Sequence, residues 1–179
     1  MYMKQLKGKQ ELKWVLIILV VFIVIFTVRT FIFMPFKVDG ESMEPTLQNK
    51  DRLFVNKIII NFSPIKHGDI VVIKKTEDQM YLVKRVIGLA GDVVKITEGK
   101  LYINGVEQKE AYLNQDLLEQ YKQLNYAEQK IRVNKVFVMG DNRLNSKDSR
   151  NGLGYIDESD IVGKTEFVYY PFNKIKFIN

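Results

Sequence analysis

The chain carries few side chains that could act as a nucleophile or a base. It has no cysteine and a single histidine, His67. Thiol chemistry is therefore excluded, and neither a metal site of the usual histidine and cysteine ligands nor any other cofactor is expected. His67 lies in the turn-like sequence KHGD (66–69), and we interpret it as an exposed turn residue. Hydrolysis would then need a hydroxyl nucleophile and a neutral lysine as its base.

Lys84 is the lysine whose surroundings best fit this role, because it lies in the apolar sequence YLVKRVI (81–87). In a strand alternate residues share a face, so Leu82, Lys84 and Val86 are expected to lie together, with Arg85 on the opposite face. Burial among apolar side chains lowers the pKa of a lysine by up to about 3–5 units. The alternative is an edge-strand lysine that prevents aggregation, and the pattern alone leaves both interpretations open.

Two polar segments contain the candidate hydroxyl groups. Ser42 lies in GESMEPTL (40–47), a loop-like sequence that by itself is also typical of an ordinary turn. The second segment, GDNRLNSKDSR (140–150), follows the apolar run 136–139. Its closely spaced acidic and basic residues predict charge-paired hydrogen bonds that fix the shape of the loop. A solvated surface loop is the alternative for this segment.

The elements that would position these residues are short strands. Alternating apolar patterns bounded by Gly, Asp and Asn predict an all-β domain beyond Pro35. The sequence Asn104-Gly105 between apolar runs predicts a hairpin. Residues 107–130 are polar and rich in Gln, Glu and Lys, which indicates an insertion with a short helix that caps the domain. The predicted strands are 52–56, 69–74, 80–88, 92–97, 135–139 and 166–170.

An apolar segment near the N-terminus predicts a membrane anchor. Trp14 to Val28 carries no formal charge, but at about 1.5 Å per residue it spans only roughly 22 Å of a hydrocarbon core of about 30 Å. Apolar and aromatic residues up to position 34 extend it. A cleavable signal peptide is the rival interpretation, but the sequence after Val28 has no small-residue cleavage site. An uncleaved transmembrane anchor over 14–34 is therefore favoured.

Charge predicts how the chain is oriented in the membrane. The net charge is +6, and the first thirteen residues hold four lysines against Glu11, which is +3 of that total. This bias predicts a cytoplasmic tail over 1–13 and an extracytoplasmic domain over 35–179. The remaining charge is scattered without a basic face, so a nucleic-acid partner is not expected.

Taken together and in this order, the motifs closely resemble those of bacterial type I signal peptidases of the short, single-anchor kind. The resemblance covers the whole chain and rests on GESMEPTL (40–47), GDIVV (68–72), YLVKRVIGLAGD (81–92) and GDNRLNSKDSR (140–150), with NGLG (151–154) after it. It implies an all-β catalytic domain that rests on the membrane, with a small insertion over 98–134. It also implies a serine endopeptidase that removes signal peptides from secretory preproteins after small residues at positions −3 and −1.

The resemblance assigns roles to individual residues. Ser42 would be the nucleophile, Lys84 the general base, and Ser146 the hydroxyl that hydrogen-bonds and orients the lysine amine. Asp148 and Arg150 would support the site by shaping it, and Asp141 and Arg85 would form a supporting ion pair. The walls of the substrate pockets would be formed by Phe36, Val38, Met43, Leu47, Leu82 and Val83.

This chain departs from the family pattern at two positions. Gly40 stands where some members carry a serine that assists the oxyanion, so the second oxyanion donor is unassigned. Ala90 stands where a proline is usual, which lowers the rigidity of that turn. Two other functions compete with general signal-peptide cleavage: a membrane-anchored scaffold that does not cut, and a Ser-Lys protease dedicated to one precursor. The oligomeric state is not predicted.

Overall fold

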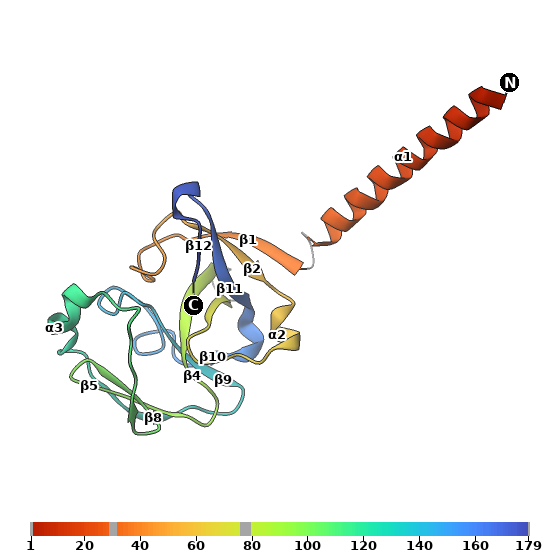
Figure 1. Cartoon of the computed structure of the whole chain (residues 1–179). Helices are drawn as coiled ribbons and strands as arrows, with labels where there is room; N and C mark the ends of the chain where they lie inside the picture. The colour runs from red at the N-terminus through yellow and green to blue at the C-terminus, as the bar shows by residue number, and fades with distance from the viewer. Residues whose placement is uncertain (1, 29–31, 76–79, 179) are drawn as a thin grey trace.

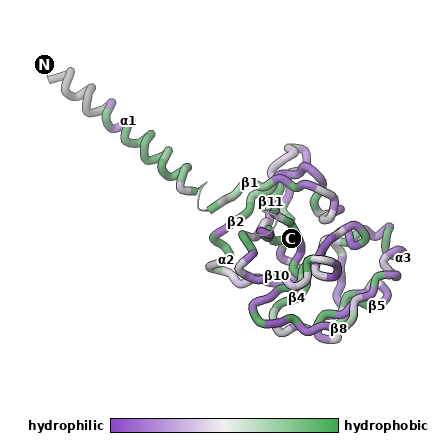
Figure 2. Tube along the Cα trace, turned by 180° about the vertical axis from the view of Figure 1, so that it is seen from behind, coloured by the Kyte–Doolittle hydropathy of each residue, from purple (hydrophilic) through white to green (hydrophobic). Residues whose placement is uncertain are grey.

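The computed structural model describes residues 2–28, 32–75 and 80–178. Helix α1 (Tyr2–Thr27) extends away from a body made mostly of β-strands (Figure 1). The large apolar side chains of α1 between Leu12 and Phe26 are exposed, and Figure 2 shows this part of the helix as hydrophobic. Within the part of the chain that the structure describes, no helix combines the length and apolar character needed to cross a membrane.

The body is built on a large antiparallel sheet. Among the described residues it contains eight strands in the order β1-β2-β11-β3-β4-β9-β10, with β12 paired to β11. One short helix, α2 (Ile59–Phe62), follows β2, and the 3-10 turns η3 (Glu158–Asp160) and η4 (Phe172–Lys174) flank β11. The strand bounds are Phe33–Lys37 (β1), Arg52–Asn56 (β2), Ile70–Lys75 (β3), Met80–Gly88 (β4), Lys135–Met139 (β9), Ile156–Asp157 (β10), Ile161–Tyr170 (β11) and Lys176–Phe177 (β12).

A smaller sheet follows β4 in the chain. Its strand order is β7-β6-β5-β8, from Val93–Thr97 (β5), Lys100–Ile103 (β6), Val106–Glu107 (β7) and Tyr126–Lys130 (β8). The turn η2 (Gln115–Leu117) and helix α3 (Leu118–Tyr121) lie between β7 and β8. Phe137 and Met139 of β9 pack against apolar residues of this sheet, so the two sheets share a core.

The predicted all-β organisation is confirmed in outline. Strands β2, β4 and β9 have the predicted bounds, and β3 and β5 each begin one residue later than predicted. The hairpin at Asn104-Gly105 is also present, with φ values of 53° and 81° that fit a two-residue turn of left-handed backbone. A short helix occurs in the insertion, as expected.

Several boundaries differ from the predictions. Helix α1 ends at Thr27, and Phe33 and Met34, which the prediction gave to the anchor, belong to β1 because that strand pairs with β2. The predicted insertion over 98–134 leaves out β5, which begins at Val93 and pairs with β6 and β8 of the small sheet. Strand β11 begins at Ile161 instead of 166. Strand β8 lies in a segment that was predicted as a polar cap. Its side chains are mostly polar and exposed, so the sequence gives no alternating apolar pattern that would indicate its pairing with β5.

Candidate active site

Ser42 and Lys84 meet although they come from different elements. The Lys84 Nζ donates a hydrogen bond of 2.6 Å to the Ser42 Oγ. Lys84 lies in β4 and its residue is only 3% exposed, whereas Ser42 is half-buried in the loop after β1. Met43 and Leu47 fix this loop, since both are buried in the core below it and the Leu47 amide donates to the Met43 carbonyl at 2.9 Å.

Strand β4 explains why the lysine is both buried and accessible. Lys84 pairs with Val71 of β3 on one side. On the other side, pairing with β9 begins only at Arg85, which lies opposite Met139. Strand β4 is therefore paired on both sides at Arg85. Among the described residues, Lys84 and the residues before it in β4 are paired only with β3. The interpretation of Lys84 as an edge-strand lysine exposed to prevent aggregation is wrong, because its side chain is buried and donates to Ser42.

The electrostatic surroundings of Lys84 favour a neutral amine at mildly alkaline pH. Burial lowers the pKa of Lys84 from 10.5 to about 8. The carboxylates of Asp148 and Asp141 act in the opposite direction, and the Arg150 guanidinium lowers the pKa further. A lysine with a pKa near 8 can accept a proton at a pH where an ordinary lysine cannot.

The predicted ion pair between Arg85 and Asp141 is present and fully buried. The Arg85 Nε and Nη2 donate to the two Asp141 carboxylate oxygens at 2.9 and 2.7 Å. Arg85 also donates to the Gly68 carbonyl at 2.9 Å, and the Thr46 hydroxyl donates to Asp141. This bidentate pair ties β4 to the Ser42 loop, which contains Thr46, and to the polar loop 140–150.

Asp148 and Arg150 form a second buried pair in the polar loop. The Arg150 Nε and Nη2 donate to the Asp148 carboxylate at 2.9 and 2.8 Å, and the Gly140 amide donates to it at 3.0 Å. Burial acts to raise the pKa of Asp148, but the hydrogen bonds from Arg150 and Gly140 outweigh it and the pKa is lowered. The charge-paired interpretation of this loop is therefore confirmed over the solvated alternative.

Ser146 lies near the dyad without the hydrogen bond that the resemblance implied. Its Oγ is buried, makes no hydrogen bond to Lys84 among the described residues, and acts on Asp148, whose pKa it helps to lower. A Cβ atom added to Gly140 would lie 2.3 Å both from the Ser146 Oγ and from the Ser42 carbonyl oxygen. Gly140 therefore lets the polar loop pack directly on the backbone of Ser42, and the Asn142 backbone amide donates to the Ser42 carbonyl at 3.1 Å.

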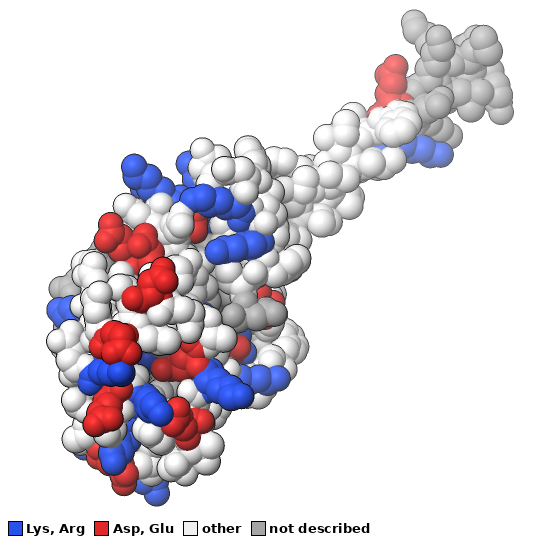
Figure 3. Space-filling view, turned by 60° about the vertical axis from the view of Figure 1, so that its left-hand side comes forward, with Lys and Arg blue, Asp and Glu red and all other residues white. Residues whose placement is uncertain are grey.

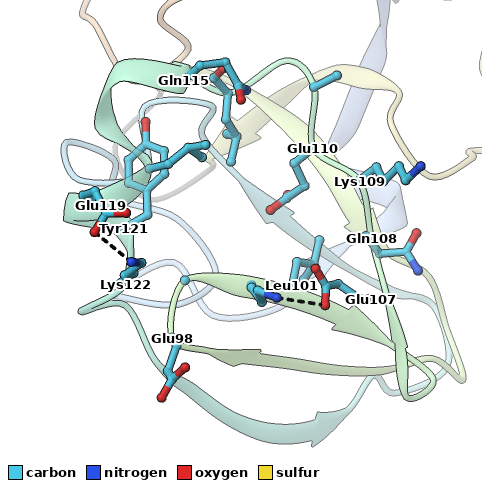
Figure 4. A pocket seen from close by; sticks show the side chains of 15 residues that line it. Glu98, Leu101, Glu107, Gln108, Lys109, Glu110, Gln115, Glu119, Tyr121 and Lys122 are labelled. Carbon is cyan, nitrogen blue, oxygen red and sulfur yellow. Dashed lines mark hydrogen bonds and ion pairs between the residues drawn. The ribbon is translucent and has the colours of Figure 1, made fainter.

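A cleft of about 330 Å³ opens beside the dyad. Ser42 and Lys84 line it, together with five of the six residues predicted as pocket walls: Phe36, Val38, Met43, Leu82 and Val83. The sixth, Leu47, does not line this cleft, because it is fully buried in the core beneath the Ser42 loop. Lys37, Asp39, Met80 and Tyr81 complete the lining. A larger cavity of about 520 Å³ lies in the small sheet and contains neither dyad residue (Figure 4).

The sequence interpretation missed three residues that form a connected cluster beside the site's ion pairs. Arg143 is 4% exposed and binds Glu110 through two hydrogen bonds of 3.1 and 2.6 Å. The Tyr112 ring lies under Arg85, with 3.9 Å between the Arg85 Cζ and the ring centroid. Arg143 was visible in the polar loop, but Glu110 and Tyr112 lie in the insertion, where nothing in the local sequence signals a contact with a loop 30 residues away.

The strand-rich body thus brings Lys84 and Ser42 into hydrogen-bond contact beside a cleft. Residues 11–170 match the family described as signal peptidase, peptidase S26. Signal peptidase I P of Bacillus subtilis subsp. natto is 43% identical over 98% of both chains. Signal peptidase I S of Bacillus subtilis (strain 168) is 42% identical over 97% of this chain and 96% of its own.

A solved structure agrees with these relatives. The crystal structure of a signal peptidase I from Enterococcus faecalis V583 superimposes with a TM-score of 0.50 at 29% identity, over 57% of this chain and 97% of the solved one. The chain therefore belongs to the bacterial type I signal peptidases of peptidase family S26, which are serine peptidases.

Proposed function

We propose that this chain cleaves signal peptides from exported preproteins with Ser42 as nucleophile and Lys84 as general base. The observation that carries the proposal is the 2.6 Å contact between the Lys84 Nζ and the Ser42 Oγ at a buried site. A serine hydroxyl is a weak nucleophile until a base removes its proton. The lowered pKa of Lys84, about 8, supports an amine able to do so.

The chemistry follows from this pair. The neutral Lys84 amine accepts the Ser42 proton while the Oγ attacks the carbonyl carbon of the scissile bond. The resulting oxyanion accepts a hydrogen bond from the Ser42 backbone N–H. The Lys84 ammonium then gives its proton to the leaving amine, and the bond to the mature protein breaks. Water, deprotonated by the same amine, hydrolyses the acyl-enzyme and frees Ser42.

The remaining site residues support this reaction. The buried Ser146 hydroxyl, which lies beside Gly140 and acts on Asp148, would orient the lysine amine. The pairs Asp141–Arg85 and Asp148–Arg150 hold the two loops. Gly40 supplies no hydroxyl for the oxyanion, and its φ of 105° would strain any other residue at that position.

The cleft supports a preference for small residues at substrate positions −1 and −3. Its lining mixes apolar and polar side chains and comes from two segments, the end of β1 with the Ser42 loop and the first half of β4, with Val38, Met43 and Val83 as apolar walls. Residues 80–84 of β4 pair only with β3 within the described chain, so their other side can bind an extended peptide as an added strand. Alternate side chains of such a peptide would enter the cleft.

We place the site on the outer surface of a membrane. The exposed apolar side chains of α1 from Trp14 to Phe26 support attachment to lipid. The apolar stretch is shorter than an average hydrocarbon core, so flanking residues would reach the interfaces or the bilayer would thin locally. The lysines before Trp14 favour a cytoplasmic N-terminus and an extracytoplasmic body.

The test is cleavage of a complete preprotein with an Ala-x-Ala boundary by the detergent-solubilised chain. Wild type is expected to cut after the final Ala, as read from the product mass. Ser42→Ala and Lys84→Ala are expected to lose about 10⁴-fold or more in rate. Ser159→Ala and Lys95→Ala remove the same groups from exposed positions and are expected to cut like wild type.

Three other outcomes would each contradict a different part of the proposal. If folded wild type cuts neither this preprotein nor a second unrelated one, the chain is a scaffold or serves one dedicated precursor. If Lys84→Ala cuts at the wild-type rate, Lys84 is not the base. Cleavage at another position would contradict the preference for small residues.

A further inference from the structure

A buried polar cluster joins the insertion to the dyad. Glu110 and Tyr112 lie on the segment between β7 and η2, and Figure 4 shows the Glu110 side chain pointing to the opposite side from that of Lys109. The Tyr112 hydroxyl donates to the Glu110 carboxylate at 2.7 Å, and Arg143 donates to both, at 2.6 Å to Glu110 and 3.1 Å to Tyr112. The side chains of Arg143 and Glu110 are 3% and 8% exposed, so this ion pair is almost completely desolvated.

One route from this cluster leads to the backbone of the nucleophile. The Arg143 Nε donates to the Gly140 carbonyl at 3.0 Å, and the Arg143 carbonyl accepts a hydrogen bond of 2.9 Å from Arg150. Gly140 packs against the Ser42 carbonyl oxygen, to which the Asn142 amide donates at 3.1 Å. Arg143 thus sets the path of the tight turn that holds the Ser42 backbone.

A second route leads to the base. The Tyr112 ring lies 3.9 Å from the Arg85 Cζ, a distance at which a guanidinium is attracted to an aromatic face. Arg85 follows Lys84 in β4 and neutralises Asp141, one of the two carboxylates that act on Lys84. The groups that face Lys84 are Ser42, Asp148, Asp141 and Arg150. Displacement of Arg85 would leave the charge of Asp141 less compensated.

We propose that Glu110 and Tyr112 are positioning residues for the hydrolysis, acting on Ser42 through Arg143 and on Lys84 through Arg85. This inference rests on the proposed function. It makes the segment between β7 and η2 part of the catalytic apparatus, since the two residues that order both arginines come from this segment and not from the large sheet. Neither residue lines the cleft.

The placement predicts a particular kinetic signature. Because the cleft walls do not change, KM for a preprotein should stay within about twofold, while a misplaced nucleophile or base lowers kcat. Loss of the Tyr112 ring should also move the acid limb of the pH–rate profile to higher pH, since an uncompensated Asp141 favours the Lys84 ammonium. A residue with only a structural role would change the melting temperature and leave this limb in place.

The experiment measures kcat, KM and the pH–rate profile of the full chain in detergent for Tyr112→Leu, Tyr112→Phe and Glu110→Gln. Tyr112→Leu is expected to lower kcat by about 10- to 100-fold and to raise the apparent pKa of the acid limb. Glu110→Gln, which keeps the shape, is expected to lower kcat about tenfold. Tyr112→Phe keeps the ring over Arg85, so its pH–rate profile should have the same acid limb as wild type.

A matched control separates positioning from stability. Tyr126 packs on Phe137 with ring centroids 5.0 Å apart, in the core of the small sheet, so Tyr126→Leu should lower the melting temperature without moving kcat or the acid limb. Should Tyr112→Leu not fold, Glu110→Gln decides. Wild-type kcat in Glu110→Gln, and a wild-type kcat and pH profile in Tyr112→Leu where it folds, would overturn the inference alone, whereas an inactive wild type would overturn it together with the proposed function.

Discussion

At the scale of the residue, Lys84 is held at a cost in folding free energy. Its pKa is lowered from 10.5 to about 8, mainly by burial. At about 1.4 kcal/mol per unit, this shift corresponds to a penalty of about 3 kcal/mol for carrying the charged amine in the folded state. The penalty is fully present below pH 8. It decreases as pH rises from 8 to 10.5, because the unfolded chain still binds the proton while the folded chain does not.

Lys84→Met is therefore expected to stabilise the protein where the lysine is charged. We predict a gain of about 2–3 kcal/mol in the free energy of unfolding near pH 7, since the hydrogen bond to Ser42 is lost at the same time. The gain should shrink as the pH approaches 10. Urea denaturation at both pH values measures it. If Lys84→Met were less stable than wild type near pH 7, and by the same amount at high pH, the result would contradict a Lys84 amine destabilised by burial.

At the scale of the element, the site depends on the close approach of the polar loop 140–150 to the Ser42 loop. Gly140 is buried where a Cβ would lie 2.3 Å from a backbone oxygen, which cannot move without shifting Ser42. The loop can fold so tightly because each of its buried charges is paired.

Gly140→Ala is predicted to lower kcat/KM by about 100-fold and stability by about 1–3 kcal/mol. Gly163→Ala is its matched control, because the added Cβ would lie 2.5 Å from the Asn56 carbonyl oxygen, between β11 and β2. The control should lose stability but keep the wild-type rate per folded molecule. Thermal melts and initial rates measure both. Equal loss of activity in the two variants would show that general destabilisation, rather than the position of Ser42, is responsible.

The elements differ in how far the sequence predicts them. Strands such as β4 and β9 are found because their apolar patterns are local, and the polar loop is found because its charges are dense. Ser42 and Lys84 come together through pairings between distant segments, so the resemblance to a family was needed to connect them. Tyr112 and Glu110 escaped prediction because a cation-π contact and an ion pair across 30 residues leave no local pattern. Leu47 was misplaced because an apolar residue near a nucleophile fits a core as well as a pocket wall.

At the scale of the whole molecule, charge and apolar surface are separated. On the face that Figure 3 shows, acidic and basic side chains are interspersed over the body, whereas the described part of α1 nearest the body carries neither. The exposed side chains of α1, including Ile18 and Phe22 at 66% each, are not covered by any other described part of the chain. The proposed attachment to lipid would cover them.

Replacing Ile18 and Phe22 together by lysine is predicted to abolish binding to neutral phosphatidylcholine vesicles. Each buried charge costs about 2.5–3.5 kcal/mol at the centre of a membrane helix, so partitioning should fall by more than about 1,000-fold. The melting of the body should not change, because these side chains do not pack on it. Vesicle flotation measures the partitioning. Undiminished flotation would exclude α1 as the site of attachment.

The most direct test of the account is the pH dependence of kcat/KM for cleavage of a peptide substrate that does not titrate between about pH 6 and 10. Since only the neutral amine accepts the Ser42 proton, kcat/KM should rise about tenfold per pH unit below the pKa of Lys84 and level off above it. The burial of Lys84 places that bend near pH 8. A profile that is flat between about pH 6 and 10 would contradict a lysine base and, with it, the proposed roles of Ser42 and Lys84.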